Sequence, residues 1–392
     1  MINKIKTFCR NKQRIIIPVL VFLASFSLIF LYVNVFSSSD YPSHIRSSLR
    51  GDGYSLISFL VIISYKLTGS SFTFVLVMSL ITTLTVYGCA FYIKTILSLL
   101  GEKVELYKII PVSSANLFIC KLCIPEWSGY YYEGSLVTQP WHNSTYTAMR
   151  LFAIITMAYY FLIENEYKEN INMKYCVMFS LFLLLSNLSK PNFIIVFAPV
   201  MLFVLIYDFI KTRTKSFRNA FIFGMCIVVT LFVLVIQYTI LFSASDGSGT
   251  ILSFDNAIGY ISKDKKFILY LLLNYCFPLY ASYLIVVNKK RIKQLYCRPI
   301  IENWLMAVFS ILVYLFIVET GHRSADGNFG WGMPFFAYSL FSTCLAYLYV
   351  FHKNKAIDDK HYQIGKTIYL LHIIFGLFYF GLLLMGYLSW GI

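Results

Sequence analysis

The sequence predicts an all-α membrane protein, a polytopic bundle of transmembrane helices formed by one integral-membrane domain over residues 1–392. The chain is 58% hydrophobic and only 13% charged, which is more apolar surface than a water-soluble fold can bury. Apolar runs of about 20 residues, the length of helix that crosses a bilayer core, recur along the whole chain. The formal net charge is +15, but Lys and Arg gather in short connections between the apolar runs. This pattern indicates membrane topology and not a nucleic-acid partner.

The first apolar run follows a basic N-terminal segment and has no small-residue cleavage site. We therefore expect a retained first span and not a cleaved signal peptide. The run at 55–68 is about 14 residues long, which is short for a span. About eleven spans are expected, over residues 15–36, 72–98, 109–124, 143–163, 173–189, 191–210, 218–243, 267–287, 302–319, 335–352 and 367–390.

Charge in the connections sets the expected orientation. With a cytoplasmic N-terminus, eleven spans place the basic connections 211–219, 288–298 and 353–366 inside, as the positive-inside rule requires. If 55–68 also crossed, all three would lie outside. We therefore expect 52–68 to form a membrane-surface or re-entrant helix in the first external loop. The boundary at Lys190-Pro191 is compatible with a tight external turn or with a kink in one long helix.

The first external loop contains Asp40-Tyr41-Pro42-Ser43-His44, just beyond the first span. If a helix starts near Pro42, Asp40 precedes its first turn and His44 follows one turn later, so a carboxylate and an imidazole would face one pocket. Asp40, or Asp52 further along the loop, could then act as a general base toward an acceptor hydroxyl. The alternative is an ordinary helix N-terminus, with Asp40 as its N-cap and His44 as a solvent-exposed surface residue.

The other predicted external loops combine aromatic rings with hydrogen-bonding side chains, whereas the internal loops are short and basic. Rings at a membrane edge commonly form an aromatic belt. Rings interleaved with polar groups also suit sugar binding, because an aromatic face stacks on a pyranose ring. The candidate sugar or acceptor contacts are Glu126, Trp127, Glu133, Trp141, His142, Asn143, Asp326, Asn328 and Trp331.

Basic side chains in the same loops indicate an anion near the sugar. Arg323, Lys190 and His322 are the candidates for a phosphate, since a fixed arginine fork binds phosphate bidentately. The alternative is that these side chains only reach toward the membrane interface.

Several chemistries have no motif in this sequence. There is no P-loop, no GxGxxG after a strand and no HExxH, and the internal loops are too short for a nucleotide-binding domain. No DxD carboxylate pair is present to hold the metal of a nucleotide sugar. A sugar donor carried on a lipid phosphate is therefore expected. The sequence indicates no certain cofactor and leaves the use of a divalent metal open.

The layout resembles the C-type (GT-C) integral-membrane glycosyltransferases, which use polyprenyl-phosphate sugars. In that superfamily an acidic residue follows the first span and membrane-surface helices come next, positions held here by Asp40 and 52–68. Trp141-His142-Asn143-Ser144-Thr145, Lys190-Pro191-Asn192-Phe193 and 323–329 look like blocks of uncharacterised bacterial proteins of this type. Several members continue into a soluble domain, and we expect no such domain after the last expected span, 367–390.

This resemblance implies an inverting glycosyltransferase in the bacterial inner membrane, with its active site on the extracytoplasmic face. Its expected partners are a lipid-linked sugar donor, a glycan or glycolipid acceptor and the membrane itself, with no nucleic acid. An O-antigen or capsule repeat-unit polymerase is an alternative, although its usual large external loops are absent from the sequence. A polysaccharide flippase or transporter is a third, which predicts more polar residues within the spans.

Overall fold

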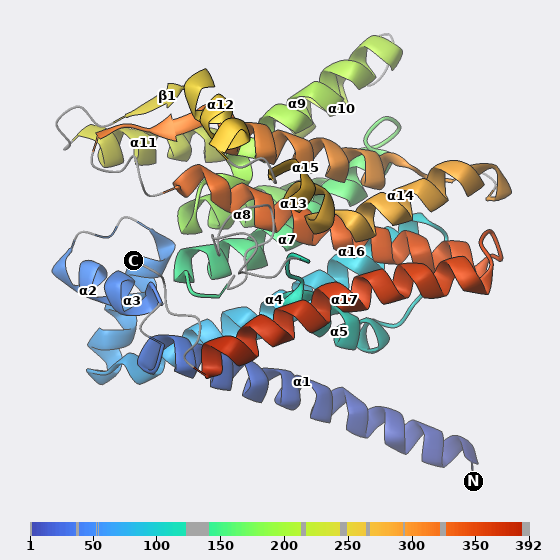
Figure 1. The fold of residues 1–392 in the computed structure, drawn as a ribbon, viewed down its shortest axis with the longest axis horizontal. Helices are drawn as coiled ribbons and strands as arrows, with labels where there is room; N and C mark the ends of the chain where they lie inside the picture. Colours follow the sequence, from blue (N-terminus) through green and yellow to red (C-terminus); the bar gives the residue numbers. More distant parts are fainter. Residues whose placement is uncertain are drawn as a thin grey trace.

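The structure, a computed structural model, describes residues 2–36, 39–51, 53, 55–122, 141–212, 217–243, 249–263, 267–292, 295–321 and 327–385. These ranges are almost entirely helical (Figure 1). The first half contains α1 (Ile2–Asn34), α2 (Tyr41–Arg50), α3 (Leu56–Thr68), α4 (Ser71–Leu99), α5 (Leu106–Ala115), η1 (Asn116–Phe118), α7 (Ser144–Glu166) and α8 (Met173–Ser189). The second half contains α9 (Asn192–Thr212), α10 (Phe217–Met225), α11 (Val228–Ser243), β1 (Thr250–Leu252), α12 (Phe254–Lys263), α13 (Phe267–Asn274), α14 (Cys276–Asn288), η2 (Lys289–Arg291), α15 (Arg298–Phe316), β2 (Ile317–Glu319), η4 (Asn328–Trp331), α16 (Gly332–Lys353) and α17 (Asp359–Leu384).

The protein is a multi-pass membrane protein, because many of its helices are long and apolar enough to cross a bilayer. Within the described ranges eight helices meet this description: Ile15–Asn34, Ser71–Leu99, Ser144–Glu166, Asn192–Lys211, Phe217–Ile240, Arg298–Phe316, Asn328–Lys353 and Asp359–Leu384. A bent pair, Ile268–Asn274 with Cys276–Arg291, adds a ninth if its two helices, which meet at 67°, form one span.

The main departure from the expected eleven spans is the run over 109–124. Its helix, α5, ends at Ala115, and the next residue, Asn116, turns its side chain into polar contacts inside the bundle. The Asn116 amide donates to the Ser342 hydroxyl over 3.0 Å and accepts from the Tyr369 hydroxyl over 2.6 Å. A non-helical backbone is tolerated at membrane depth where protein surrounds it. This stretch is therefore a short, broken helix and not a continuous span.

Two shorter apolar helices complete the bundle. α3 has 13 residues, too few to span, as expected for a helix that does not cross. α8 has 17 residues and ends just before a turn at Pro191 that leads into α9. The rings of Phe179 on α8 and Phe197 on α9 lie 5.9 Å apart, so the two helices pack against each other. Lys190-Pro191 is thus a turn and not a kink in one long helix.

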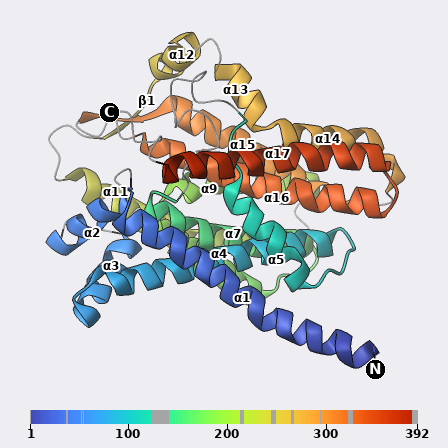
Figure 2. The same ribbon diagram turned by 60° about the horizontal axis from the view of Figure 1, so that its bottom comes forward.

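The bundle has two chemically distinct ends, visible at the left and right of Figures 1 and 2. The Asp40 end contains α2, α3, the short β1–β2 pair and the first residues of α4, α7, α9 and α16. The Arg298 end contains the last residues of α7, α9 and α16 and the start of α15. Here Lys353 pairs with Glu102, and Arg291 donates to the Ala356 carbonyl over 3.0 Å. Described members of the three basic connections, Lys211, Lys289 and Lys353, lie at this same end.

α16 is the central helix of the bundle. In its span, 89% of the residues are buried, against 22% for α1 and 17% for the α10–α11 span. The strands β1 and β2 pair antiparallel, with Thr250 opposite Glu319 and Leu252 opposite Ile317. This pairing ties the loop before α12 to the end of α15, and so holds Glu319 near the start of α16.

Candidate functional site

Asp40 directly precedes α2, and Pro42 occupies the first turn of that helix, as the sequence predicts. The Asp40 side chain makes no capping hydrogen bond to the helix. Instead the Ser43 hydroxyl donates to the Asp40 main-chain carbonyl over 2.8 Å. The carboxylate is therefore not used to start the helix, and it is available for other contacts.

The Asp40 carboxylate contacts the segment that begins α7. Asn143 Nδ2 donates to Asp40 Oδ2 over 2.9 Å, and His142 Nε2 lies 3.5 Å from the same oxygen. The backbone holds the two segments together, since Asp40 N donates to the His142 carbonyl over 2.9 Å. The Asp40 side chain remains 39% exposed. Its carboxylate is thus positioned by neighbours and still open to a ligand.

Asn143 fixes the direction of its own amide. Its Oδ1 accepts from the backbone N–H of Tyr146 over 2.9 Å and from the Thr145 hydroxyl over 2.7 Å, so it caps the N-terminus of α7. Because the oxygen is engaged by the helix, the amide nitrogen is the group that faces Asp40. The start of a long span therefore positions the carboxylate of a loop.

His44 lies one turn into α2, and its Nδ1 shares a 2.6 Å hydrogen bond with the Ser144 hydroxyl. Burial lowers the pKa of His44 to about 4, an effect that the charge of Asp40 opposes and that Lys190 and His142 add to. The imidazole is therefore neutral at neutral pH. It can exchange hydrogen bonds with a ligand or with Ser144, but it does not supply a permanent positive charge.

Lys190 and Trp331 lie next to His142 and belong to the same group of side chains. The Lys190 ammonium lies 5.2 Å from the centre of the Trp331 ring, within the range of a cation–π contact. The Trp331 ring lies 5.1 Å from that of His142 and 4.9 Å from that of Tyr146. We use the name Asp40 cluster for the six predicted residues that the fold brings together: Asp40, His44, His142, Asn143, Lys190 and Trp331.

Asn328, another predicted residue, lies beside the cluster in a supporting position. Asn192 Nδ2 donates to the Asn328 carbonyl over 2.5 Å, and Asn328 Nδ2 donates to Glu319 over 2.7 Å. These contacts join the first turn of α9 to the turn before α16, and therefore fix Lys190 relative to Trp331. Glu319, at the end of β2, was not predicted because it ends an apolar run without any motif.

Trp141 does not present its ring at the surface. Only 2% of the residue is exposed, and its ring packs 4.9 Å from Phe118 and 6.3 Å from Phe380. It belongs to the core that supports His142, and not to a stacking surface. The predicted site residues Asp52, Glu126, Trp127, Glu133, His322, Arg323 and Asp326 lie outside the described residues.

Sequence reasoning also missed Arg150, which is only 2% exposed in α7, two turns below Asn143. A signal was present, because Arg150 is a lone charge within an otherwise apolar run and charged residues inside spans are rare.

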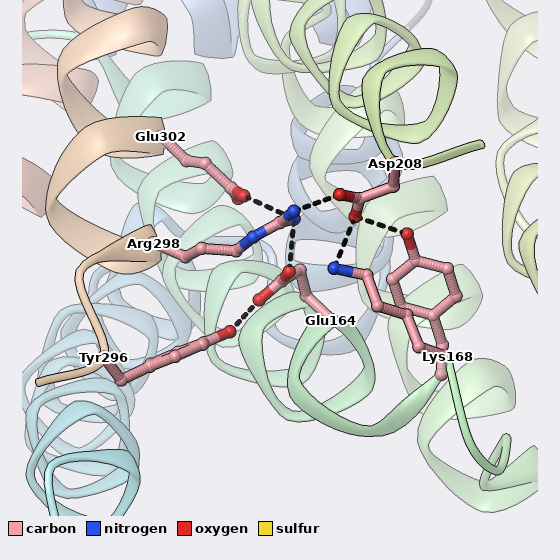
Figure 3. Close-up of polar contacts among 7 residues, drawn as sticks. Glu164, Lys168, Asp208, Tyr296, Arg298 and Glu302 are labelled. Atoms are coloured by element: carbon pink, nitrogen blue, oxygen red, sulfur yellow. Dashed lines mark hydrogen bonds and ion pairs between the residues drawn. The ribbon is translucent and has the colours of Figure 1, made fainter. Parts of the chain in front are cut away.

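A second group of charges lies at the Arg298 end (Figure 3). The Arg298 guanidinium lies 2.5 Å from Glu164 Oε1, pairs with Asp208, and lies 3.5 Å from Glu302. Lys168 pairs with Asp208 over 3.0 Å. These contacts join the last turns of α7 and α9 to the first turn of α15. Because the carboxylates are almost fully buried and face cations, the group acts as a structural clamp.

The Asp40 cluster can perform specific chemistry. An accessible carboxylate held by an amide suits a general base, and a neutral imidazole beside it can donate or accept a hydrogen bond. A tryptophan ring with an ammonium above it suits a sugar that carries a negative group. Among the described residues, no group of three or more His, Cys, Asp or Glu side chains is placed to hold a metal ion.

Comparisons of the chain with protein-family models, with curated protein sequences and with solved structures found no match.

Proposed function

We propose that the protein is a membrane-embedded glycosyltransferase that moves a sugar from a polyprenyl-phosphate or polyprenyl-pyrophosphate carrier to a cell-surface glycan or glycolipid. The observation that carries this proposal is the Asp40 carboxylate, which is 39% exposed and held by Asn143 without capping α2. A carboxylate that only starts a helix would be spent on the helix backbone.

In this mechanism Asp40 accepts the proton of the acceptor hydroxyl. The hydroxyl oxygen attacks the anomeric carbon of the donor sugar, while the bond from that carbon to the carrier phosphate oxygen breaks. One displacement of this kind inverts the anomeric configuration. Asn143 keeps the carboxylate in position, which matters because misplacement by about 1 Å can cost 10²-fold in rate.

The leaving phosphate needs positive charge where its own charge develops. Lys190 is the described cation of the cluster, and Arg323 and His322 are the further candidates from the sequence. Trp331 is the candidate sugar contact, and it would stack on the sugar once Lys190, which lies over its ring, turns to the phosphate. In this scheme His44 is a neutral hydrogen-bonding group beside the base.

The proposed location is the bacterial inner membrane, with the N-terminus in the cytoplasm and the Asp40 end on the extracytoplasmic face. The basic connections at the opposite end support this orientation. Carrier-linked sugars that have been moved across the membrane would reach the cluster from the outer leaflet.

The proposal is tested by deleting the gene in its source organism and determining the composition and linkage of the envelope glycans by mass spectrometry. We expect the loss of one sugar or branch, which the wild-type gene restores. A change confined to the number of repeat units would instead indicate a polymerase. Accumulation of finished lipid-linked units on the cytoplasmic side would indicate a flippase.

A further inference from the structure

Arg150 is a buried cation inside a membrane span. It lies six residues after Ser144 in α7 and is 2% exposed. At the rise of an α-helix this places its Cα about 9 Å along the axis from the start of the span. Charged side chains at such positions are costly and commonly mark ligand or ion sites.

Among the described residues, no carboxylate pairs with the charge of Arg150. Its Nε and Nη2 are buried and have no hydrogen-bond partner in the described part of the chain. Its nearest described neighbours are two tyrosines: the guanidinium carbon lies 5.4 Å from the ring centre of Tyr338 and 5.8 Å from that of Tyr146, whose hydroxyl also interacts with the guanidinium. Contacts with two rings recover only part of the cost of burying a charge.

Two hydroxyls near Arg150 have unused donors. The hydroxyls of Tyr41 and Tyr338 are buried and, within the described residues, have no hydrogen-bond partner. Burial raises the pKa of Tyr41, and the nearby Thr147 hydroxyl and, less strongly, the charge of Arg150 oppose this shift only in part. Tyr41 is therefore a neutral phenol that can donate a hydrogen bond. A guanidinium and two phenols together provide several donors, which is the arrangement that an anion requires.

This group of side chains lies directly next to the Asp40 cluster. Tyr41 follows Asp40 in the chain, and the Tyr146 ring on which Arg150 lies is 4.9 Å from Trp331. We propose that Arg150, with the hydroxyls of Tyr41 and Tyr338, forms a buried binding site for a phosphate group. The choice of a carrier phosphate as ligand rests on the proposed function, whereas the anion site itself does not.

The test compares thermal unfolding of the full-length protein in detergent with three probes: undecaprenyl phosphate, undecaprenol and inorganic phosphate. We expect undecaprenyl phosphate to raise the unfolding temperature of the wild type and undecaprenol to leave it unchanged. Arg150→Met should weaken the apparent affinity about 10–100-fold, the loss expected for hydrogen bonds to a charged group. Arg46→Met is the matched control, because Arg46 is exposed on α2 at the same end.

Two further measurements distinguish a ligand-binding role of Arg150 from a structural one. Without ligand, Arg150→Met should unfold at the same or a higher temperature, since it removes a buried charge that has no ion-pair partner among the described residues. A marked loss of stability, or failure to fold, would mean that Arg150 is neutralised within the chain and would overturn the site. Tyr338→Phe removes only a hydroxyl and should weaken phosphate binding about three- to tenfold.

The remaining outcomes separate the possible ligands and the two proposals. If inorganic phosphate alone stabilises the protein through Arg150, the site takes free phosphate and not a lipid. If neither phosphate binds, or if binding survives Arg150→Met, the site is refuted. Sugar transfer that still depends on Asp40 would then leave the proposed function intact. Conversely, Arg150-dependent phosphate binding without any sugar transfer would retain the site and reject the glycosyltransferase.

Discussion

The side-chain amide of Asn143 donates a 2.9 Å hydrogen bond to the carboxylate of Asp40, across a sequence separation of 103 residues. The same Asn143 caps α7 through its other amide atom. One residue thus starts a membrane span with its oxygen and orients a loop carboxylate with its nitrogen. This double use makes Asn143 the residue at which helix capping and the proposed chemistry can be separated.

Asn143→Asp should reduce sugar transfer about 10²-fold, with little change in the unfolding temperature. Aspartate is as good an N-cap as asparagine, so α7 keeps its start. The second carboxylate cannot donate to Asp40 and repels it, which displaces the base. Transfer is measured with membranes that contain equal amounts of each variant. Asn172→Asp is the matched control, because Asn172 caps α8 in the same way. Equal activity of the two variants would contradict this role for Asn143.

His44 should make the folded protein sensitive to acid. Its pKa is lowered from 6.5 to about 4 by burial, so below pH 6.5 the unfolded chain takes up a proton that the folded protein does not. The contribution of neutral His44 to the free energy of unfolding is therefore fully present above pH 6.5. It is lost as the pH falls toward about 4. Thermal unfolding across this range should show a steeper decline for the wild type than for His44→Gln. Parallel curves would mean that His44 already binds its proton in the folded state.

Arg298→Met should destabilise the protein by about 3–5 kcal/mol, the range for removing one partner of a buried charge group. Glu164, Asp208 and Glu302 would then face one another with Lys168 as their remaining described cation. Lys353→Met is the control, because Lys353 is half-exposed and its pair with Glu102 should contribute little. Thermal unfolding in detergent makes the comparison. The clamp role would be refuted by equal unfolding temperatures of the two variants.

Much of the Asp40 cluster was predictable, because membrane topology restricts where a loop can lie. Once the spans are counted, Asp40, Asn143, Lys190 and Trp331 fall in connections at one end of the bundle, and only their exact contacts remain unknown. The sequence could not decide whether Asp40 caps α2, since an aspartate before Tyr-Pro suits either role. The structure shows that the Asp40 side chain makes no capping hydrogen bond and accepts one from Asn143, whereas its role as a base stays a prediction.

Other features depended on packing that a linear pattern does not contain. The run at 109–124 is apolar enough for a span, but Asn116 finds its partners Ser342 and Tyr369 on two distant helices, and α5 ends there. Trp141 resembles a surface ring next to His142, yet the neighbouring Phe380 places it in the core. Both outcomes depend on residues more than 200 positions away.

The orientation predicts which end of the bundle reacts with reagents outside the cell. Because the described native cysteines are buried or partly buried, reporter cysteines are placed at exposed positions in a variant whose native cysteines are replaced. Ser43→Cys, at the Asp40 end, should react with an impermeant maleimide on intact cells. Lys290→Cys, at the Arg298 end, should react only after the membrane is permeabilised. The reverse pattern would place the Asp40 cluster in the cytoplasm.

The most direct measurement is sugar transfer by Asp40→Asn in the deletion strain, with glycan composition as the readout. Asparagine keeps the shape of the side chain and its ability to accept a hydrogen bond, but it cannot take up the proton of an acceptor hydroxyl. We predict that Asp40→Asn is produced and inserted normally and restores none of the missing sugar. Asp255→Asn, which changes an exposed carboxylate on α12, should restore it fully. Restoration by Asp40→Asn to the wild-type level would contradict the role of Asp40 as the base.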